Sequence, residues 1–265
     1  MNFRWSAVLV FVLALSTVGC TTLVSLPAST PATADEAGRS WAAVLQRFVD
    51  ERGDVDFAAL AEDRAVLDHV VRHVAQTPPD SLADGPERLA YFINAYNALS
   101  MFNVIDSGIP QTHAGFNKVS FFVLRRFTVG GRAMSLRSFE NDVIRPYARA
   151  RGDPRFHFAL NCSAVACPVL PRVPFTAANL DAELERETRA FFARDANFRV
   201  DAVNRTVWLS KILDFYPEDF VPVPAHSLLA YANRYAPAPA PADYQVRFTP
   251  YDWTVANSRR PRAAP

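Results

Sequence analysis

Lysine, excess charge and long hydrophobic runs are all scarce in this sequence. Only Lys118 and Lys211 are lysines, so arginine supplies almost all of the 28 basic residues, and we expect surface ion pairs to be built on arginine. The 27 acidic residues balance the basic ones. No basic excess is left to neutralise phosphates, which argues against a nucleic-acid partner. Glycine-rich phosphate loops and Gly-x-Ser-x-Gly motifs are also absent.

The composition is that of a globular protein. Half of the 265 residues are hydrophobic and 21% are charged, which excludes a disordered chain because such chains combine low hydrophobicity with high net charge. The length suits one large domain or two small ones, and either can bury a core.

The longest apolar run is short and lies near the N-terminus. Residues 7–15 follow Arg4 and precede small and polar residues, the pattern of a secretory signal peptide. A transmembrane helix needs about 20 apolar residues, so this run is too short to be one. Residues 17–20, Thr-Val-Gly-Cys, resemble a bacterial lipobox, in which the cysteine is lipidated; the alternative is a plain signal peptide. We expect a signal peptide at 1–19 and a lipid at Cys20.

Such a lipid makes the membrane a partner, because several acyl chains anchor a protein stably. Thr21, and not Asp, follows the cysteine, so no inner-membrane retention signal is indicated and we expect the protein on the periplasmic face of the outer membrane. Residues 20–35 are rich in Ala, Thr, Ser and Pro and predict a flexible tether. Residues 36–257 are expected to form a single domain, and residues 258–265 a loose tail.

Hydrophobic spacing predicts the elements of that domain. Expected helices cover 36–52, 57–75, 86–106, 135–147, 177–194 and 227–235. Expected strands are 155–160 and 244–248, with hairpins joining 121–129 to 132–134 and 198–200 to 206–209. Helices first and mixed elements later are typical of an α+β fold, with the helical N-terminal part packed on a small, mostly antiparallel sheet.

The residues best suited to chemistry lie in 155–168. Cys162 is a candidate thiolate nucleophile, and His157 is a candidate base that takes its proton. A disulfide between Cys162 and Cys167 is the alternative, because the periplasm oxidises thiols. These three residues are too few for a zinc site, which needs about four ligands, so no metal and no cofactor is expected.

Two motifs resemble the domain of unknown function 547 family. Residues 91–99, Tyr-Phe-Ile-Asn-Ala-Tyr-Asn-Ala-Leu, are similar to the family's aromatic-Ile-Asn-x-Tyr-Asn-x-Leu helix. Residues 157–162, His-Phe-Ala-Leu-Asn-Cys, and 167–170, Cys-Pro-Val-Leu, are similar to its second segment. The resemblance spans roughly 53–253. It implies a fold more than a reaction, because the family's activity is not settled, and it is compatible with a papain-like or transglutaminase-like thiol site.

Two positions depart from the family pattern. Ser163 stands where members often have Gly, and Asn141 stands where many carry His after the Glu that matches Glu140. If that His is the catalytic base elsewhere, this chain lacks it.

Three asparagines and one glutamate complete the candidate site. Asn94 and Asn97 are three apart on one helix and share a face; with Asn161 they are candidates for substrate binding, or for tying a neighbouring loop. Glu140 is a candidate to orient His157, the alternative being a solvated charge or an arginine partner.

The leading hypothesis is a thiol-dependent hydrolase or acyl transferase acting on amide bonds of an unknown envelope substrate. Cys162 attacks, His157 moves the proton, and Glu140 or Asn94 orients His157; backbone amides after Cys162 form the oxyanion site. The alternative is a non-enzymatic periplasmic lipoprotein that binds a partner or has a structural role, with a Cys162–Cys167 disulfide.

Overall fold

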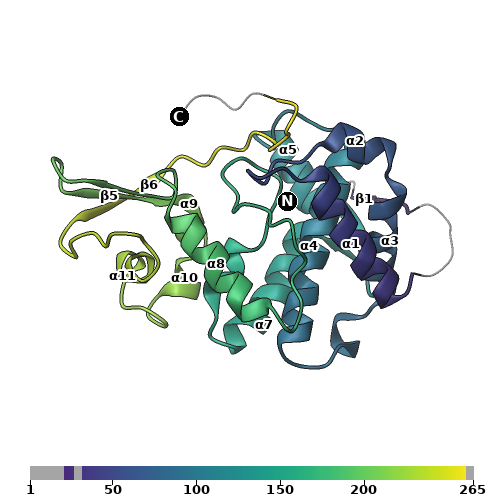
Figure 1. Cartoon of the computed structure of the whole chain (residues 1–265), viewed down its shortest axis with the longest axis horizontal. Coiled ribbons are helices and arrows are strands. Elements are labelled where there is room, and N and C mark those ends of the chain that lie inside the picture. The colour runs from purple at the N-terminus through teal and green to yellow at the C-terminus, as the bar shows by residue number, and fades with distance from the viewer. Residues whose placement is uncertain (1–20, 27–31, 261–265) are drawn as a thin grey trace, which may run out of the picture.

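The computed structural model describes residues 21–26 and 32–260 and has an α+β fold (Figure 1), which confirms the expected class. Helices α1 (Ala34–Phe48), α3 (Ala65–Gln76) and α4 (Pro86–Asp106) gather at one end of the molecule. The sheet of β4 (Phe198–Asp201), β5 (Thr206–Ser210) and β6 (Gln245–Thr249), with α11 (Leu228–Asn233), lies at the other end.

Apart from α8, the remaining helices and strands are all shorter than α1, α3 and α4. They are β1 (Thr22–Leu23), α2 (Phe57–Glu62), η1 (Pro79–Ser81), α5 (Phe116–Val119), η2 (Ser120–Leu124), β2 (Arg125–Val129), β3 (Arg132–Ser135), α6 (Leu136–Ser138), η3 (Phe139–Ile144), α7 (Arg145–Ala150), η4 (Pro154–Phe158), α8 (Leu180–Phe192), α9 (Lys211–Phe215) and α10 (Pro217–Phe220). Within the described ranges, no helix has the length and apolar character needed to cross a membrane. The expected signal peptide and Cys20 lie outside the described residues.

Helix α4 is the central helix of the larger core and matches its predicted bounds. Pro86 occupies its first turn, where a missing N–H costs nothing. Gly108 follows its end with φ +81, a left-handed conformation suited to glycine. Most side chains from Leu89 to Val104 are buried, so the polar residues of this helix must find partners inside the protein.

Both sheets are small and mixed rather than mostly antiparallel. In the first, β1 is parallel and β3 antiparallel to β2; in the second, β6 is parallel and β4 antiparallel to β5. Strand β1 lies within the stretch expected to be a tether. The expected Gly130-Gly131 turn joins β2 to β3 with φ of +53 and +80. A Cβ on Gly130 would come within 2.4 Å of Pro78 Cα, so only glycine fits there.

Three predicted elements take a different form. The helix expected over 57–75 is divided into α2 and α3, because Asp63 leaves the helical conformation, with φ −113 and ψ 46, and ends α2. The helix expected over 135–147 includes the π-helical turn η3. Residues 121–124, the start of the strand expected over 121–129, belong instead to the π-helical turn η2.

The strand expected at 155–160 is instead the 3₁₀ helix η4. Asp153 accepts a hydrogen bond from the Arg155 N–H at 3.1 Å, and Pro154 fits the first helical position, so the local chemistry starts a helical turn. Phe156 packs in the larger core and Phe158 in the smaller one. His157 therefore lies buried between the two cores.

The C-terminal segment returns across the molecule to the cysteine loop (Figure 1, yellow). Its residues 252–256 run between 111–113 and 163–166: the His113 N–H donates to the Trp253 carbonyl at 2.8 Å, and the Val165 N–H donates to the Thr254 carbonyl at 2.8 Å. In the stretch expected to be a loose tail, residues 258–260 are held by hydrogen bonds to residues 55, 109 and 110.

Candidate functional site

Two free thiols and a phenol meet in the interior. Cys162 and Cys167 are 7% and 4% exposed and form no disulfide. The Cys162 N–H donates to Cys167 Sγ at 3.1 Å. Tyr251 Oη lies 3.2 Å from Cys167 Sγ and 3.8 Å from Cys162 Sγ. The pair is thus a dithiol in this structure.

The hydrogen bonds make the two thiols unequal. Burial opposes ionisation of Cys167, but hydrogen bonds from Cys162 and Tyr251 outweigh it and lower the pKa of the Cys167 thiol. The hydrogen bond with Cys167, then burial, raises the pKa of the Cys162 thiol. Because Cys167 Sγ accepts the Cys162 N–H and lies nearer than Cys162 Sγ to the Tyr251 hydroxyl, these contacts favour a negative charge on Cys167.

The loop that carries the thiols is held by Asn161. Its N–H donates to Asn97 Oδ1 at 2.7 Å, its Nδ2 donates to the Pro168 carbonyl at 2.7 Å, and its Oδ1 accepts the Ser163 N–H at 2.6 Å. Ser163 has φ +63, a conformation that favours glycine. This conformation gives a physical reason for the glycine that the family often has at that position.

Asn94 and Asn97 also tie loops. Asn97 Nδ2 donates to the Ala159 carbonyl at 2.9 Å. Asn94 pairs with both backbone groups of Phe175 and accepts the Trp41 Nε1–H at 3.0 Å. The structure thus matches the loop-tying alternative for these asparagines, and their amide groups are occupied by the protein itself.

The expected oxyanion amides are also mostly occupied. The N–H groups of Ser163, Val165 and Cys167 all donate to other protein acceptors. The Ala164 amide acts on the two sulfurs and favours their ionised form, although the net pKa of the Cys162 thiol is raised. Donors available beside the sulfurs are therefore the Ala164 N–H and the Tyr251 hydroxyl.

A carboxylate that the sequence analysis did not identify holds the histidine. His157 Nε2 lies 2.7 Å from Asp219 Oδ2, and its ring stacks on Tyr216 with centroids 4.5 Å apart. Burial opposes ionisation of Asp219, but hydrogen bonds from His157 and Arg145 lower its pKa to about 2. An ionised carboxylate can only accept, so Nε2 carries the proton and the lone pair is on Nδ1. Burial lowers the pKa of His157 and keeps the ring neutral.

The two expected orienting residues do not hold the ring. Glu140 accepts a hydrogen bond from the Tyr96 hydroxyl at 3.1 Å instead, although its charge raises the pKa of His157. Asn94 is engaged with Phe175 and Trp41. Asp219 is 62 residues from His157, on the short helix α10, so no local pattern marks it.

All of these groups border one small cavity of about 70 Å³. Its lining includes His157, Glu140, Cys162, Cys167, Tyr216 and Tyr251. A neighbouring cleft of about 440 Å³ shares five lining residues with it: Phe122, Glu140, Phe215, Tyr216 and Trp253. The small cavity has room for a few atoms only, whereas the neighbouring cleft has room for a larger ligand.

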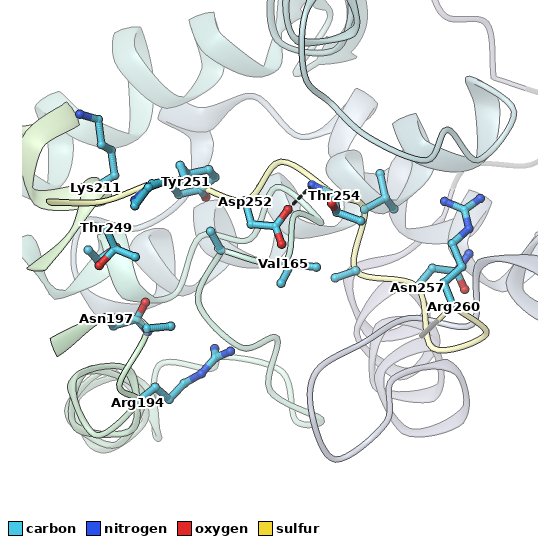
Figure 2. Close-up of a pocket in the computed structure, with 16 residues that line it drawn as sticks. Val165, Arg194, Asn197, Lys211, Thr249, Tyr251, Asp252, Thr254, Asn257 and Arg260 are labelled. Carbon is cyan, nitrogen blue, oxygen red and sulfur yellow. Dashed lines mark hydrogen bonds between the residues drawn. The ribbon is translucent and has the colours of Figure 1, made fainter. Parts of the chain in front are cut away.

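A third cavity, of about 670 Å³, also borders Tyr251 (Figure 2). Lys211 and Arg260 stand at opposite ends of it, and the Asp252 carboxylate between them accepts the Thr254 N–H at 2.9 Å. Lys211 pairs with Asp214, and Arg260 donates to backbone carbonyls. The described residues that line this cavity include no thiol and no histidine. In the described part of the chain, no group of three or more potential ligands is assembled for a metal ion.

Comparison with known proteins gives one match. Residues 79–192 match the model of a family described as "Protein of unknown function, DUF547", which supports the resemblance inferred from the two motifs. The matched segment contains α4, His157 and both thiols but ends before Asp219 and Tyr251. No curated protein and no solved structure matches the chain. The family description assigns no activity.

Proposed function

We propose that this chain is a thiol-dependent hydrolase or acyl transferase that acts on an amide-type bond. One observation carries the proposal: the thiols and the His157–Asp219 pair border the same cavity. A sulfur nucleophile, a neutral imidazole held by a carboxylate and hydrogen-bond donors beside the sulfur are the components of nucleophilic catalysis by cysteine. Sequence analysis assigned the attack to Cys162. The hydrogen bonds favour Cys167 as the ionised member, and the proposal takes the ionised sulfur as the nucleophile.

The reaction follows from these groups. The proton of the attacking thiol passes to His157 Nδ1, and the sulfur forms a bond to the carbonyl carbon. The carbonyl oxygen becomes negative and accepts hydrogen bonds from Tyr251 and Ala164. The carbon–nitrogen bond then breaks, and the leaving nitrogen takes the proton from Nδ1. Water or another acceptor releases the acyl group from sulfur and returns a proton through the same ring.

Asp219 and Glu140 stabilise the protonated ring during this cycle. Asp219 accepts the Nε2–H throughout, and the charges of Asp219 and Glu140 both raise the pKa of His157 against burial. Glu140 therefore keeps a place in the site through its charge, not through a hydrogen bond to the ring.

Alkylation tests the proposal directly. The mature chain with Cys20→Ser is purified from the periplasm without reductant and treated with iodoacetamide across a pH series, and the peptide containing both cysteines is weighed. We expect two free thiols, one of which reacts rapidly near neutral pH. Cys167→Ser removes the rapid reaction, while Cys162→Ser retains a reactive thiol. An unlabelled peptide two hydrogens lighter would show a disulfide and contradict the proposal in favour of the non-enzymatic alternative.

Lipid anchoring at Cys20 and an outer-membrane location remain proposals as well. Strand β1 begins at Thr22 and pairs with β2. A lipid on Cys20 would therefore hold the domain close to the membrane surface.

A further inference from the structure

The cleft in front of the thiol cavity has an apolar wall that water contacts. Val119, Val123 and Phe215 line it and are 45%, 37% and 37% exposed. Phe215 stacks with Trp253, with ring centroids 6.3 Å apart. Val119 and Val123 are four residues apart on consecutive helical turns, so they lie on one face. Clustered exposed apolar side chains are typical of an interaction surface.

Two cations without acidic partners stand at the same cleft. Lys118 Nζ lies 4.1 Å from the Trp253 ring centroid and, within the described ranges, makes no ion pair. Arg137 is exposed, and its guanidinium has neither an ion pair nor a hydrogen bond to any described residue. Arg145, by contrast, is neutralised by Glu218 and Asp219 at 2.6 and 2.9 Å.

Among the described residues, Glu140 is the one acid that lines the cleft, and it is buried and accepts a hydrogen bond from Tyr96. The rim is therefore positive, while the wall is apolar. A ligand that matches both has an apolar chain and an anionic group, and its reactive bond lies between them at the entrance to the thiol cavity.

We propose that this cleft binds an N-acylated amino acid, with its acyl chain against Val119, Val123 and Phe215 and its carboxylate at Lys118 and Arg137. The amide bond then lies where the thiols can reach it. The assignment of this ligand as the acyl donor rests on the proposed function. The binding itself does not depend on the proposed function, because none of these five residues is one of the thiols, His157 or Asp219.

Binding is measured with N-decanoylglycine on the chain in which Cys20, Cys162 and Cys167 are replaced by serine, so that no turnover occurs. Calorimetry gives the Kd. Decanoylethanolamide has the same chain and amide without the charge, and decyl phosphate has the charge without the amide.

Lys118→Ala with Arg137→Ala should raise the Kd of N-decanoylglycine about tenfold, because two exposed charge contacts are lost. The Kd of decanoylethanolamide should not change. Val119→Asp should weaken both ligands, because it places a charge in the apolar wall. Arg132→Ala is the matched control, since Arg132 is exposed on β3 and does not line the cleft.

Each other outcome has a meaning. If N-decanoylglycine does not bind saturably, or if the two rim variants leave its Kd unchanged, the proposal fails. If decyl phosphate binds and N-decanoylglycine does not, the cleft recognises a phosphate and not a carboxylate, and the proposed N-acyl amino acid is wrong. Binding only to anionic phospholipid vesicles would make the cleft a membrane-contact surface and overturn it too.

Turnover separates the two proposals. The chain with its thiols intact is incubated with N-decanoylglycine, and free glycine is measured. Release of glycine supports both the ligand and the reaction. Tight binding without release leaves the cleft assigned but contradicts its role as an acyl-donor site.

Discussion

His157 Nε2 lies 2.7 Å from Asp219 Oδ2, although 62 residues separate the two in the chain. This contact fixes the tautomer of the ring and joins η4, which carries the thiol loop, to α10 in the C-terminal part. Arg145 donates to both oxygens of the same carboxylate, and Arg149 contacts Oδ1. The buried Asp219 carboxylate therefore links α10 to the histidine of η4 and to two arginines of α7.

Asp219→Asn should remove most of the thiol reactivity and destabilise the fold. The amide cannot stabilise a protonated His157, and Arg145 loses its buried partner, which costs about 3–5 kcal/mol for a broken buried pair. The measurement is urea unfolding together with the iodoacetamide rate. Glu218→Gln is the control: Glu218 also pairs with Arg145, but its side chain is 51% exposed, so its loss should cost less than about 1 kcal/mol. Equal effects of the two variants would contradict a special role for Asp219.

Tyr251→Phe should shift the rapid alkylation to higher pH without unfolding the protein. The variant keeps the aromatic ring but loses the hydroxyl that lowers the pKa of the Cys167 thiol. The readout is the pH at which the alkylation rate reaches half its maximum. Tyr244→Phe, at a tyrosine that lines neither the thiol cavity nor the cleft, should leave that pH unchanged. An unchanged profile in Tyr251→Phe would show that the hydroxyl does not act on the thiol.

The sequence predicts elements whose signals are local. Pro86 and Gly108 bracket an apolar stretch, and α4 forms between them as expected. The Gly130-Gly131 turn is likewise a local signal. The stretch 155–160 misleads because its apolar residues face two separate cores, which mimics a buried strand, while Asp153 and Pro154 start a helical turn.

The site is predictable only in part, for a related reason. The cysteines and His157 are close in sequence, and the fold keeps them around one cavity. Asp219 and Tyr251 arrive from distant segments, and nothing in their flanking residues marks the contact. Asn94 and Asn97 share a helix face, as spacing requires, but spacing does not show that loop backbones occupy both amides.

Acid should destabilise the protein through His113. This residue is fully buried, and burial lowers its pKa to about 4 from 6.5. The unfolded chain therefore binds the proton more readily, so stability is complete above about pH 6.5 and falls as the pH drops toward about 4. The expected loss is about 3 kcal/mol, as an order of magnitude. His113→Phe keeps an aromatic ring packed on Phe121 and should make the urea midpoint less dependent on pH over this range. His226→Asn, at an exposed position, should leave that pH dependence unchanged. If the urea midpoint of His113→Phe falls with pH as much as that of the unmodified protein, His113 is not the source of the acid sensitivity.

Ser163 offers a test of backbone strain at the thiol loop. Its φ of +63 costs about 1–2 kcal/mol for a residue with a Cβ, while its hydroxyl lies 3.2 Å from that of buried Ser100. Ser163→Ala loses the hydrogen bond and keeps the strain, so it should destabilise the protein by about 1–2 kcal/mol. Ser163→Gly loses the same bond but relieves the strain, so it should be more stable than Ser163→Ala by about 1 kcal/mol. Urea unfolding of the two variants measures that difference directly, with Ser100→Ala reporting the hydrogen bond alone. If Gly and Ala prove equally stable, the left-handed backbone at Ser163 carries no strain, and the glycine that the family often has there needs another explanation.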